Sequence, residues 1–302
     1  MLTFKGGVHA PHRKQDTRNK AVEYMQAPKM VSIPLQQHIG VACQPLVKAG
    51  DAVKLGQKIG EARGFVGAPV HASVSGVVKA IKQVPHPSMG SGLAVIIEND
   101  GKDEFDDSIK PGDIGSMDAE QLKELILEAG IVGMGGAAFP THVKLSPPKD
   151  KSIDTVILNG AECEPYLTAD HRLMLEASHD VVDGLKVIMK VLGVERAYIA
   201  IEDNKPDAVQ VMADAVKSVQ GVEVKRLKTK YPQGAEKQLI YVVTGRQVPS
   251  GGLPMDVGVI VCNVGTSAAI ARAIKTGMPL IERIVTVTGS GVAEPKNLMV
   301  RI

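Results

Sequence analysis

The stretch Asp154-Thr-Val-Ile-Leu-Asn159 indicates the fold class. Its uninterrupted β-branched and apolar run has the length of a buried strand. Beyond it, the hydrophobic period changes to that of a helix over 181–192 and returns to that of a strand over 197–201. A second helix over 206–219 and a strand over 222–227 repeat the alternation. Strands alternating with helices are typical of α/β proteins.

The alternation continues to the end of the chain. Residues 257–263 predict a strand, 266–275 a helix and 284–288 a last strand. Parallel strands need a crossover connection, which is usually a helix of this length. We therefore predict an α/β fold with a Rossmann-like, mostly parallel sheet.

The start of this α/β region is marked by a helix with recognisable ends. Asp118 and Gln121 predict a capping pair in which each side chain bonds the other residue's backbone N–H. Gly130 can end the helix in the left-handed conformation. We place the beginning of the Rossmann-like domain at residue 118.

The preceding region, residues 31–98, consists of short apolar runs broken by Gly and Pro, which is an all-β signature. Residues 47–60 and 68–79 each have a strand–turn–strand pattern, and the pair resembles the two halves of a biotinyl/lipoyl-like barrel-sandwich. Such carriers present a modifiable lysine between the halves. Here the corresponding stretch is Arg63-Gly-Phe-Val-Gly67, without lysine, which favours a structural or docking module.

The remaining segments are polar. Residues 1–30 are rich in His, Lys and Arg and are predicted to form an N-terminal arm. Residues 99–117 are acidic and contain glycine, as expected of a linker. The predicted order is an arm over 1–30, a barrel-sandwich over 31–98, a linker over 99–117 and a Rossmann-like domain over 118–302.

Composition excludes several functional classes. The formal net charge of +2 and an aromatic content of 3% give no reason to expect a nucleic-acid partner. No stretch approaches the roughly 20 apolar residues that span a bilayer, so any membrane attachment is expected through partner subunits. Cys43, Cys163 and Cys262 are too few and too far apart for a four-thiolate cluster, and we expect no metal site and a cytoplasmic location.

A glycine-rich stretch, Gly130-Ile-Val-Gly-Met-Gly-Gly-Ala-Ala-Phe-Pro-Thr-His-Val-Lys144, is the first candidate site. Small residues let backbone N–H groups approach a ligand closely, and successive N–H groups can bind an anion. Lys144 would add a positive charge for a phosphate. The alternative is a glycine-rich turn with only a structural role.

The loop after the strand over 154–159 is the second candidate. Glu162 and Glu164 lie there among small residues, and parallel sheets bind ligands at the carboxyl ends of their strands. The alternative is a solvated acidic turn, with Glu164 capping the helix that begins near Asp170.

Two helix starts complete the set of candidates. Gly234 precedes a helix with Glu236 and Lys237 in its first turn, where acids are favoured in any case. Asn263 and Thr266 follow the strand over 257–263 and could donate to a phosphate or a ring carbonyl. The alternative for Thr266 is simple N-capping.

Together these motifs resemble one family. Gly133-Met-Gly-Gly-Ala-Ala-Phe-Pro-Thr-His-Val-Lys144 is similar to the flavin loop of the NADH-binding subunit of respiratory complex I. Asn159-Gly-Ala-Glu-Cys-Glu-Pro165 resembles that family's Asn-Ala-Asp-Glu-x-Glu-Pro loop. Gly234-Ala-Glu236 is similar to its Gly-Glu-Glu motif, and Asn263-Val-Gly-Thr266 to its Asn-Val-Glu-Thr motif.

The N-terminal half narrows the resemblance to the RnfC family. Phe4-Lys-Gly-Gly-Val-His9, followed by a barrel-sandwich, resembles the RnfC arrangement. The resemblance implies an electron-entry module that oxidises NADH through bound FMN and passes electrons to iron–sulfur centres. It implies other Rnf subunits as partners and a peripheral position on the cytoplasmic face of the cell membrane. RnfC-like proteins carry 4Fe-4S clusters in a further C-terminal region, so we expect this sequence, which stops at Ile302, to be a fragment.

The resemblance implies cofactor-binding roles for individual residues and no catalytic side chain. Phe139 is implied to lie near the adenine of NADH, and Glu164 and Glu236 near its ribose and nicotinamide. Glu162 and Gly234 belong to the same binding motifs. The residues implied to hold FMN are Gly133, Gly135, Gly136, Lys144, Asn159, Asn263 and Thr266.

Three departures from the complex I pattern leave alternatives open. Ala161, Ala235 and Cys262 stand where that pattern has Asp, Glu and Asn. One alternative is a soluble RnfC-like flavin oxidoreductase, such as a cobalamin reductase or the electron-transfer partner of an amino-acid reductase. Another is a non-catalytic scaffold that has lost flavin binding.

Overall fold

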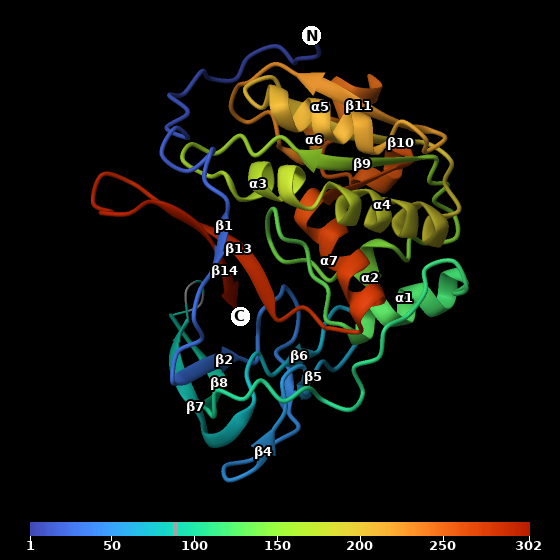
Figure 1. The fold of residues 1–302 in the computed structure, drawn as a ribbon. Coiled ribbons are helices and arrows are strands. Elements are labelled where there is room, and N and C mark those ends of the chain that lie inside the picture. Colours follow the sequence, from blue (N-terminus) through green and yellow to red (C-terminus); the bar gives the residue numbers. More distant parts are fainter. Residues whose placement is uncertain (87, 89) are drawn as a thin grey trace. The chain divides into compact units, whose positions relative to one another are not determined.

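The computed structural model describes residues 1–86, 88 and 90–302 (Figure 1). The chain forms two compact units, each assembled from several segments. The first, called the α/β unit, contains Met1–Glu23, Lys144–Ala271 and Ile284–Leu298. The second, called the barrel unit, contains Tyr24–Val143, Arg272–Arg283 and Met299–Ile302. The domain boundaries drawn from the sequence stay predictions.

A parallel sheet forms the centre of the α/β unit. Its strands are adjacent in the order β11 (Val222–Leu227), β10 (Ala197–Glu202), β9 (Thr155–Gly160) and β12 (Val259–Asn263). All three pairings are parallel. The buried strand predicted over 154–159 is β9, an inner strand, whose Val156, Ile157 and Leu158 are fully buried. The predicted Rossmann-like parallel sheet is confirmed.

Helices connect these strands in the predicted order. They are α3 (Ala169–Glu176), α4 (Ser178–Leu192), α5 (Pro206–Ala215), α6 (Glu236–Thr244) and α7 (Val264–Thr276). α3, α4 and α5 contact one another, while α6 packs on β10 and β12. Phe4 of the N-terminal arm joins the core beneath α6, where it is buried with residues of β9, β11 and β12. The arm is therefore packed into the α/β unit.

The barrel unit contains two small antiparallel sheets, as predicted for a barrel-sandwich. One sheet has the order β2 (Met30–Pro34), β8 (Gly90–Asn99), β7 (Gly76–His86) and β4 (Ala52–Val53). The other has the order β3 (Gln44–Pro45), β5 (Lys58–Glu61) and β6 (Val70–His71). Both contribute to one apolar core. Gly76 is needed where β7 begins, because a Cβ there would meet the Glu98 carbonyl oxygen at 1.9 Å.

The barrel unit also contains the helix predicted from residue 118. α1 (Ala119–Glu128) begins with the expected capping box between Asp118 and Gln121. Gly130, just beyond its end, has a φ of +65°. The short helix α2 (Thr141–Lys144) follows the glycine-rich loop.

One expectation about the sheet is wrong. The last predicted strand, β13 (Glu282–Val287), does not extend the parallel sheet but joins β14 (Lys296–Arg301) and β1 (Val22–Tyr24) in the order β1, β14, β13. Its side chains are half-buried or exposed, whereas the inner strands of the parallel sheet are almost fully buried. None of the helices in the described residues combines the length and the apolar composition of a membrane-spanning segment.

Candidate functional site

The candidate site of the α/β unit lies at the carboxyl ends of β9 and β12. Asn159 and Asn263 are register partners at the ends of these two strands. The Asn159 side chain donates to the Gly234 carbonyl at 2.9 Å and accepts from the Ala161 N–H at 3.1 Å. The Asn159 side chain therefore connects the end of β9 to Ala161 in the loop that follows it and to Gly234 before α6.

Asn263 organises the beginning of α7. Its side-chain oxygen accepts from the Gly265 N–H at 2.7 Å, and its amide nitrogen donates to the Asp170 carboxylate at 2.7 Å. Thr266 is buried inside the first turn, so the helix start is capped by Asn263 and the N-capping interpretation of Thr266 is wrong. The helix begins earlier than the sequence suggested, because Val264 and Gly265 are already helical.

Glu162 is a buried carboxylate. Its side chain is 4% exposed, and one oxygen accepts from the Asp170 N–H at 2.7 Å in the first turn of α3. Helix capping thus belongs to Glu162, and its assignment to Glu164 is wrong. Burial, reinforced by the negative charge of Asp170, raises the pKa of Glu162 to about 7 against the opposing effect of Lys14.

Glu164 differs from Glu162 although only one residue separates them. Glu164 is exposed, and its carboxylate accepts a hydrogen bond from the Tyr231 hydroxyl. The negative charge of Glu164 raises the pKa of Tyr231. A carboxylate at the surface of a loop beyond a strand end has oxygen lone pairs free to accept from a ligand.

Lys144 and Glu236 form an ion pair at the same edge of the sheet. The Lys144 ammonium lies 3.4 Å from a Glu236 oxygen and donates to the Val261 carbonyl at 2.9 Å. Gly234 lies just before α6, where a Cβ would make ordinary van der Waals contacts with Ala161 Cβ and Cys163 Sγ at 3.4 Å. The pair is half-buried, so both charges can reach a bound molecule.

The glycine-rich loop belongs to the barrel unit. It is closed by a bridge between Val132 and Pro140 and by the Gly133 N–H, which donates to the Phe139 carbonyl at 2.9 Å. At Gly136 a Cβ would meet nothing within 4 Å. Gly135, Gly136 and Ala137 are exposed in the turn over 134–137. Such a turn fits an anionic group such as a phosphate.

The predicted site residues therefore fall into two groups. Those of the barrel unit are Gly133, Gly135, Gly136 and Phe139. Those that lie near the carboxyl edge of the parallel sheet in the α/β unit are Lys144, Asn159, Glu162, Glu164, Gly234, Glu236, Asn263 and Thr266.

A buried charge cluster beside this edge was missed from the sequence. The Lys205 ammonium lies 3.5 Å from a Glu202 oxygen, and both side chains are fully buried. Lys205 also donates to the Ala161 carbonyl, directly before the acidic loop formed by residues 162–167. The Gln233 amide is fully buried without a partner in the described part of the chain. Only the position of Glu202, at the end of a buried strand, could have signalled this cluster.

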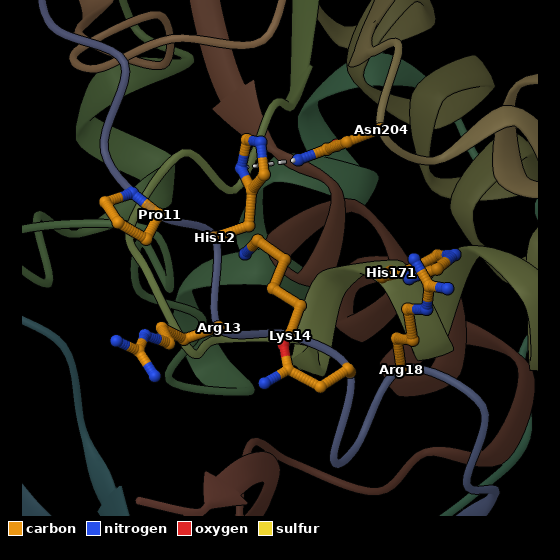
Figure 2. A pocket seen from close by; sticks show the side chains of 8 residues that line it. Pro11, His12, Arg13, Lys14, Arg18, His171 and Asn204 are labelled. Atoms are coloured by element: carbon orange, nitrogen blue, oxygen red, sulfur yellow. Dashed lines mark hydrogen bonds between the residues drawn. The ribbon is translucent and has the colours of Figure 1, made fainter.

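A cavity of about 420 Å³ opens in the α/β unit where the N-terminal arm crosses it (Figure 2). In Figure 2, Arg13 and Lys14 extend in different directions from neighbouring positions of the arm. Arg13 is exposed, whereas Lys14 is buried. The cavity lining consists of Pro11, His12, Arg13, Lys14, Gln15, Arg18, His171 and Asn204.

Two known domain families match the sequence. The Nuo51 FMN-binding domain matches residues 126–272. The RnfC barrel sandwich hybrid domain matches residues 2–102. The first match includes every candidate binding residue named above, and the second includes both sheets of the barrel unit.

Several known proteins are similar over the whole chain, and each is one component of a multi-protein oxidoreductase complex. The component from the Na⁺-translocating ferredoxin:NAD⁺ oxidoreductase complex of Acetobacterium woodii is 54% identical over 301 residues, covering 99% of this chain and 68% of that protein. Its counterpart from the proton-translocating complex of Clostridium ljungdahlii is 53% identical over 303 residues, covering 100% and 66%. A component of the ion-translocating oxidoreductase complex of Haemophilus influenzae is 41% identical, and this chain spans 46% of it.

Solved structures support the fold alone. An NAD⁺-reducing NiFe hydrogenase in the air-oxidised state aligns with a TM-score of 0.51 at 22% identity, covering 61% of this chain and 37% of that one. The hydrogen-reduced state aligns with the same TM-score at 20% identity.

Proposed function

The chain belongs to the RnfC family, and from that premise we propose that it oxidises NADH through bound FMN, as the electron-entry module of a membrane-bound Rnf-type complex. The natural acceptors would be iron–sulfur centres outside residues 1–302. The complex would hold this protein on the cytoplasmic face of the membrane through its other subunits. The chain spans 68% and 66% of its first two relatives, so the activity of the whole protein is part of the proposal.

The observation that carries this proposal is the gathering of polar groups at the carboxyl edge of β9 and β12. Ligands of open α/β sheets bind at this edge. Asn159, Asn263, Lys144 and Glu236 lie there, within the segment that matches an FMN-binding domain. When bound, FMN would supply the redox chemistry, taking two electrons from NADH and releasing them one at a time.

For FMN, the chain offers donors of two kinds. In the barrel unit, the exposed residues Gly135 and Gly136 would offer backbone N–H groups to a phosphate, in the loop that begins at Gly133. In the α/β unit, Lys144 would add a cation for a phosphate. Asn159, Asn263 and Thr266 would contribute polar contacts to the ribityl chain or the ring.

For NADH, the chain offers acceptors. Glu164 would accept hydrogen bonds from ribose hydroxyls or the carboxamide, since its carboxylate is exposed. Glu236 would do the same from the first turn of α6, while Gly234 leaves room for the dinucleotide. Phe139 would lie near the adenine, and Glu162 would keep the acidic loop attached to α3.

A titration of FMN into the protein, followed by flavin fluorescence, tests the proposal. We expect Lys144→Ala to weaken binding by about 1.5–3 kcal/mol, the scale of a hydrogen bond to a charged group. Lys237→Ala is the matched control, because Lys237 is an exposed lysine of α6 whose ammonium donates to the Pro249 carbonyl at 3.5 Å. The wild-type protein should turn yellow on purification or after FMN is added.

Two outcomes would contradict the proposal at different points. Equal FMN affinity of wild type and Lys144→Ala would exclude the phosphate role of Lys144. A wild-type protein that binds no FMN would favour the scaffold alternative, in which the losses at Ala161, Ala235 and Cys262 have abolished the flavin site.

A further inference from the structure

Lys14 of the N-terminal arm is hydrogen-bonded to the backbone of the acidic loop, residues 162–167. Its ammonium donates to the carbonyl of Glu162 at 3.0 Å, to that of Glu164 at 2.9 Å, and to that of Leu167. It also lies 3.9 Å from the Glu162 carboxylate. An ammonium has three N–H groups, so these carbonyls use all of its donors.

The loop needs such a partner because of its backbone conformation. Three carbonyl oxygens point at one place, where their partial negative charges would repel one another without a cation. Glu162 and Tyr166 have φ values of +46° and +71°, in the left-handed region that disfavours residues with side chains. Conformations of this kind persist only when surrounding contacts fix them. Lys14 provides contacts on both sides of Cys163.

The arm is itself hydrogen-bonded to the rest of the α/β unit, so the position of Lys14 is fixed. Thr17 is fully buried, and its hydroxyl accepts a hydrogen bond from the Thr168 hydroxyl at 2.7 Å. The His12 carbonyl accepts from the Tyr166 N–H at 2.9 Å. Nearer the N-terminus, Lys230 donates to the carbonyls of Phe4 and Gly6. The arm and the loop are thus connected at several points.

Because Lys14 is buried, replacing it with a neutral residue should change the conformation of the loop. The Lys14 side chain is 7% exposed, and burial lowers its pKa while the negative charge of Glu162 opposes that shift. Without the ammonium, the three carbonyls and the Glu162 carboxylate would be left in a poorly solvated place. Buried polar groups without partners drive a segment to rearrange until water or other groups satisfy them.

We propose that Lys14 is a positioning residue, which holds the loop over 162–167 so that the Glu164 carboxylate is presented to NADH. The inference rests on the proposed NADH oxidation, which it deepens by assigning a role to the arm. Lys14 touches neither cofactor nor substrate in this account. It acts through the loop backbone, and its removal should affect NADH more than FMN.

The test combines backbone hydrogen exchange with kinetics on Lys14→Met, which keeps the length of the side chain and removes its charge and donors. In the variant, we expect amides over 162–168 to exchange about tenfold faster or more, because local opening becomes easier. We expect KM for NADH to rise about tenfold, with kcat and the Kd for FMN within about twofold of wild type. Lys14→Arg, which keeps a cation with several donors, should restore most of both properties.

Lys20→Met is the matched control. Lys20 lies on the same arm and donates to the Pro295 carbonyl at 2.8 Å, but it is exposed and makes no contact with the acidic loop. Exchange over 162–168 and KM should stay at the wild-type values. If Lys14→Met does not fold, Lys14→Gln, which retains two N–H donors, is measured against the same criteria.

Unchanged exchange over 162–168 would overturn the inference, as would faster exchange spread evenly over the whole unit. Faster loop exchange with an unchanged KM would also overturn it, since the loop would then be held without consequence for NADH. Failure of the proposed function is distinguishable. In that case the wild type would not oxidise NADH at all, while exchange would still report whether Lys14 holds the loop.

Discussion

Glu162 and Glu164 differ in role because they differ in solvent exposure. Glu162 is buried, bonded to the start of α3 and close to Lys14. Glu164 is exposed, and its carboxylate accepts a hydrogen bond from the Tyr231 hydroxyl. The buried carboxylate of Glu162 therefore stabilises the loop, whereas the exposed carboxylate of Glu164 can bind a ligand.

The buried position of Glu162 predicts a pH-dependent stability. The pKa of Glu162 rises from its ordinary value of 4.5 to about 7 in the folded protein. The unfolded chain therefore releases this proton at lower pH than the folded one. Its contribution to the free energy of unfolding is complete below pH 4.5 and is lost as the pH rises to about 7.

Denaturant unfolding of wild type and Glu162→Gln between pH 4 and about 8 measures this contribution. We expect the stability of the wild type relative to the variant to fall across that window. The amide of glutamine can still accept from the Asp170 N–H but does not titrate. Parallel stability curves for the two proteins would show that Glu162 ionises normally.

At the scale of elements, the backbones of α4 and α7 lie so close together that position 184 of α4 has no room for a side chain. A Cβ at Gly184 would lie 1.7 Å from the Ser267 carbonyl oxygen, which is backbone and cannot rotate away. The Ser267 hydroxyl donates to the Val181 carbonyl at 2.8 Å and links the helices further. This contact fixes α7, which follows Asn263 and has Thr266 in its first turn, at the candidate site.

We expect Gly184→Ala to destabilise the protein by about 3 kcal/mol, the upper range for overpacking, because two helix backbones must move apart. The midpoint of thermal or denaturant unfolding measures this effect. Gly291→Ala is the control, since a Cβ there meets nothing within 4 Å, and its effect should stay within about 0.5 kcal/mol. Similar midpoints for the two variants would mean that α4 and α7 are less closely packed than described.

At the scale of the whole molecule, we expect residues 1–302 with added FMN to reduce ferricyanide with NADH and to carry no iron–sulfur cluster after anaerobic reconstitution. Cys43 and Cys262 are buried and Cys163 is half-buried, and three cysteines cannot supply four thiolates. Glu164→Gln should raise KM for NADH about tenfold, the loss of one good hydrogen bond to a charged group.

Glu223→Gln, a change at an exposed strand glutamate paired with Lys225, is the control for that assay and should leave KM unchanged. Stoichiometric iron and sulfide in the purified monomer would contradict the absence of a cluster. A normal KM in Glu164→Gln, together with a lower melting temperature, would assign Glu164 a structural role only.

The sequence by itself determined the helices and strands of this protein and their order along the chain. Hydrophobic period, glycine and capping residues are local signals, and they were enough to predict β9 to β12, the helices between them, the capping box at Asp118 and the barrel-sandwich. The motifs around Asn159 and Asn263 could be placed at strand ends for the same reason. That these ends lie side by side followed from the parallel sheet.

Only the tertiary structure decided which polar residues are buried and what they contact. Lys14 lies far from Glu162 along the chain, and nothing near Lys14 indicates that three loop carbonyls surround it. The same applies to β13, which joins β1 and β14 instead of the parallel sheet. The residues of the Glu202–Lys205 pair are only three positions apart, but their complete burial depends on how the surrounding elements pack. Long-range contacts depend on how elements pack, and a single sequence carries no local signal for them.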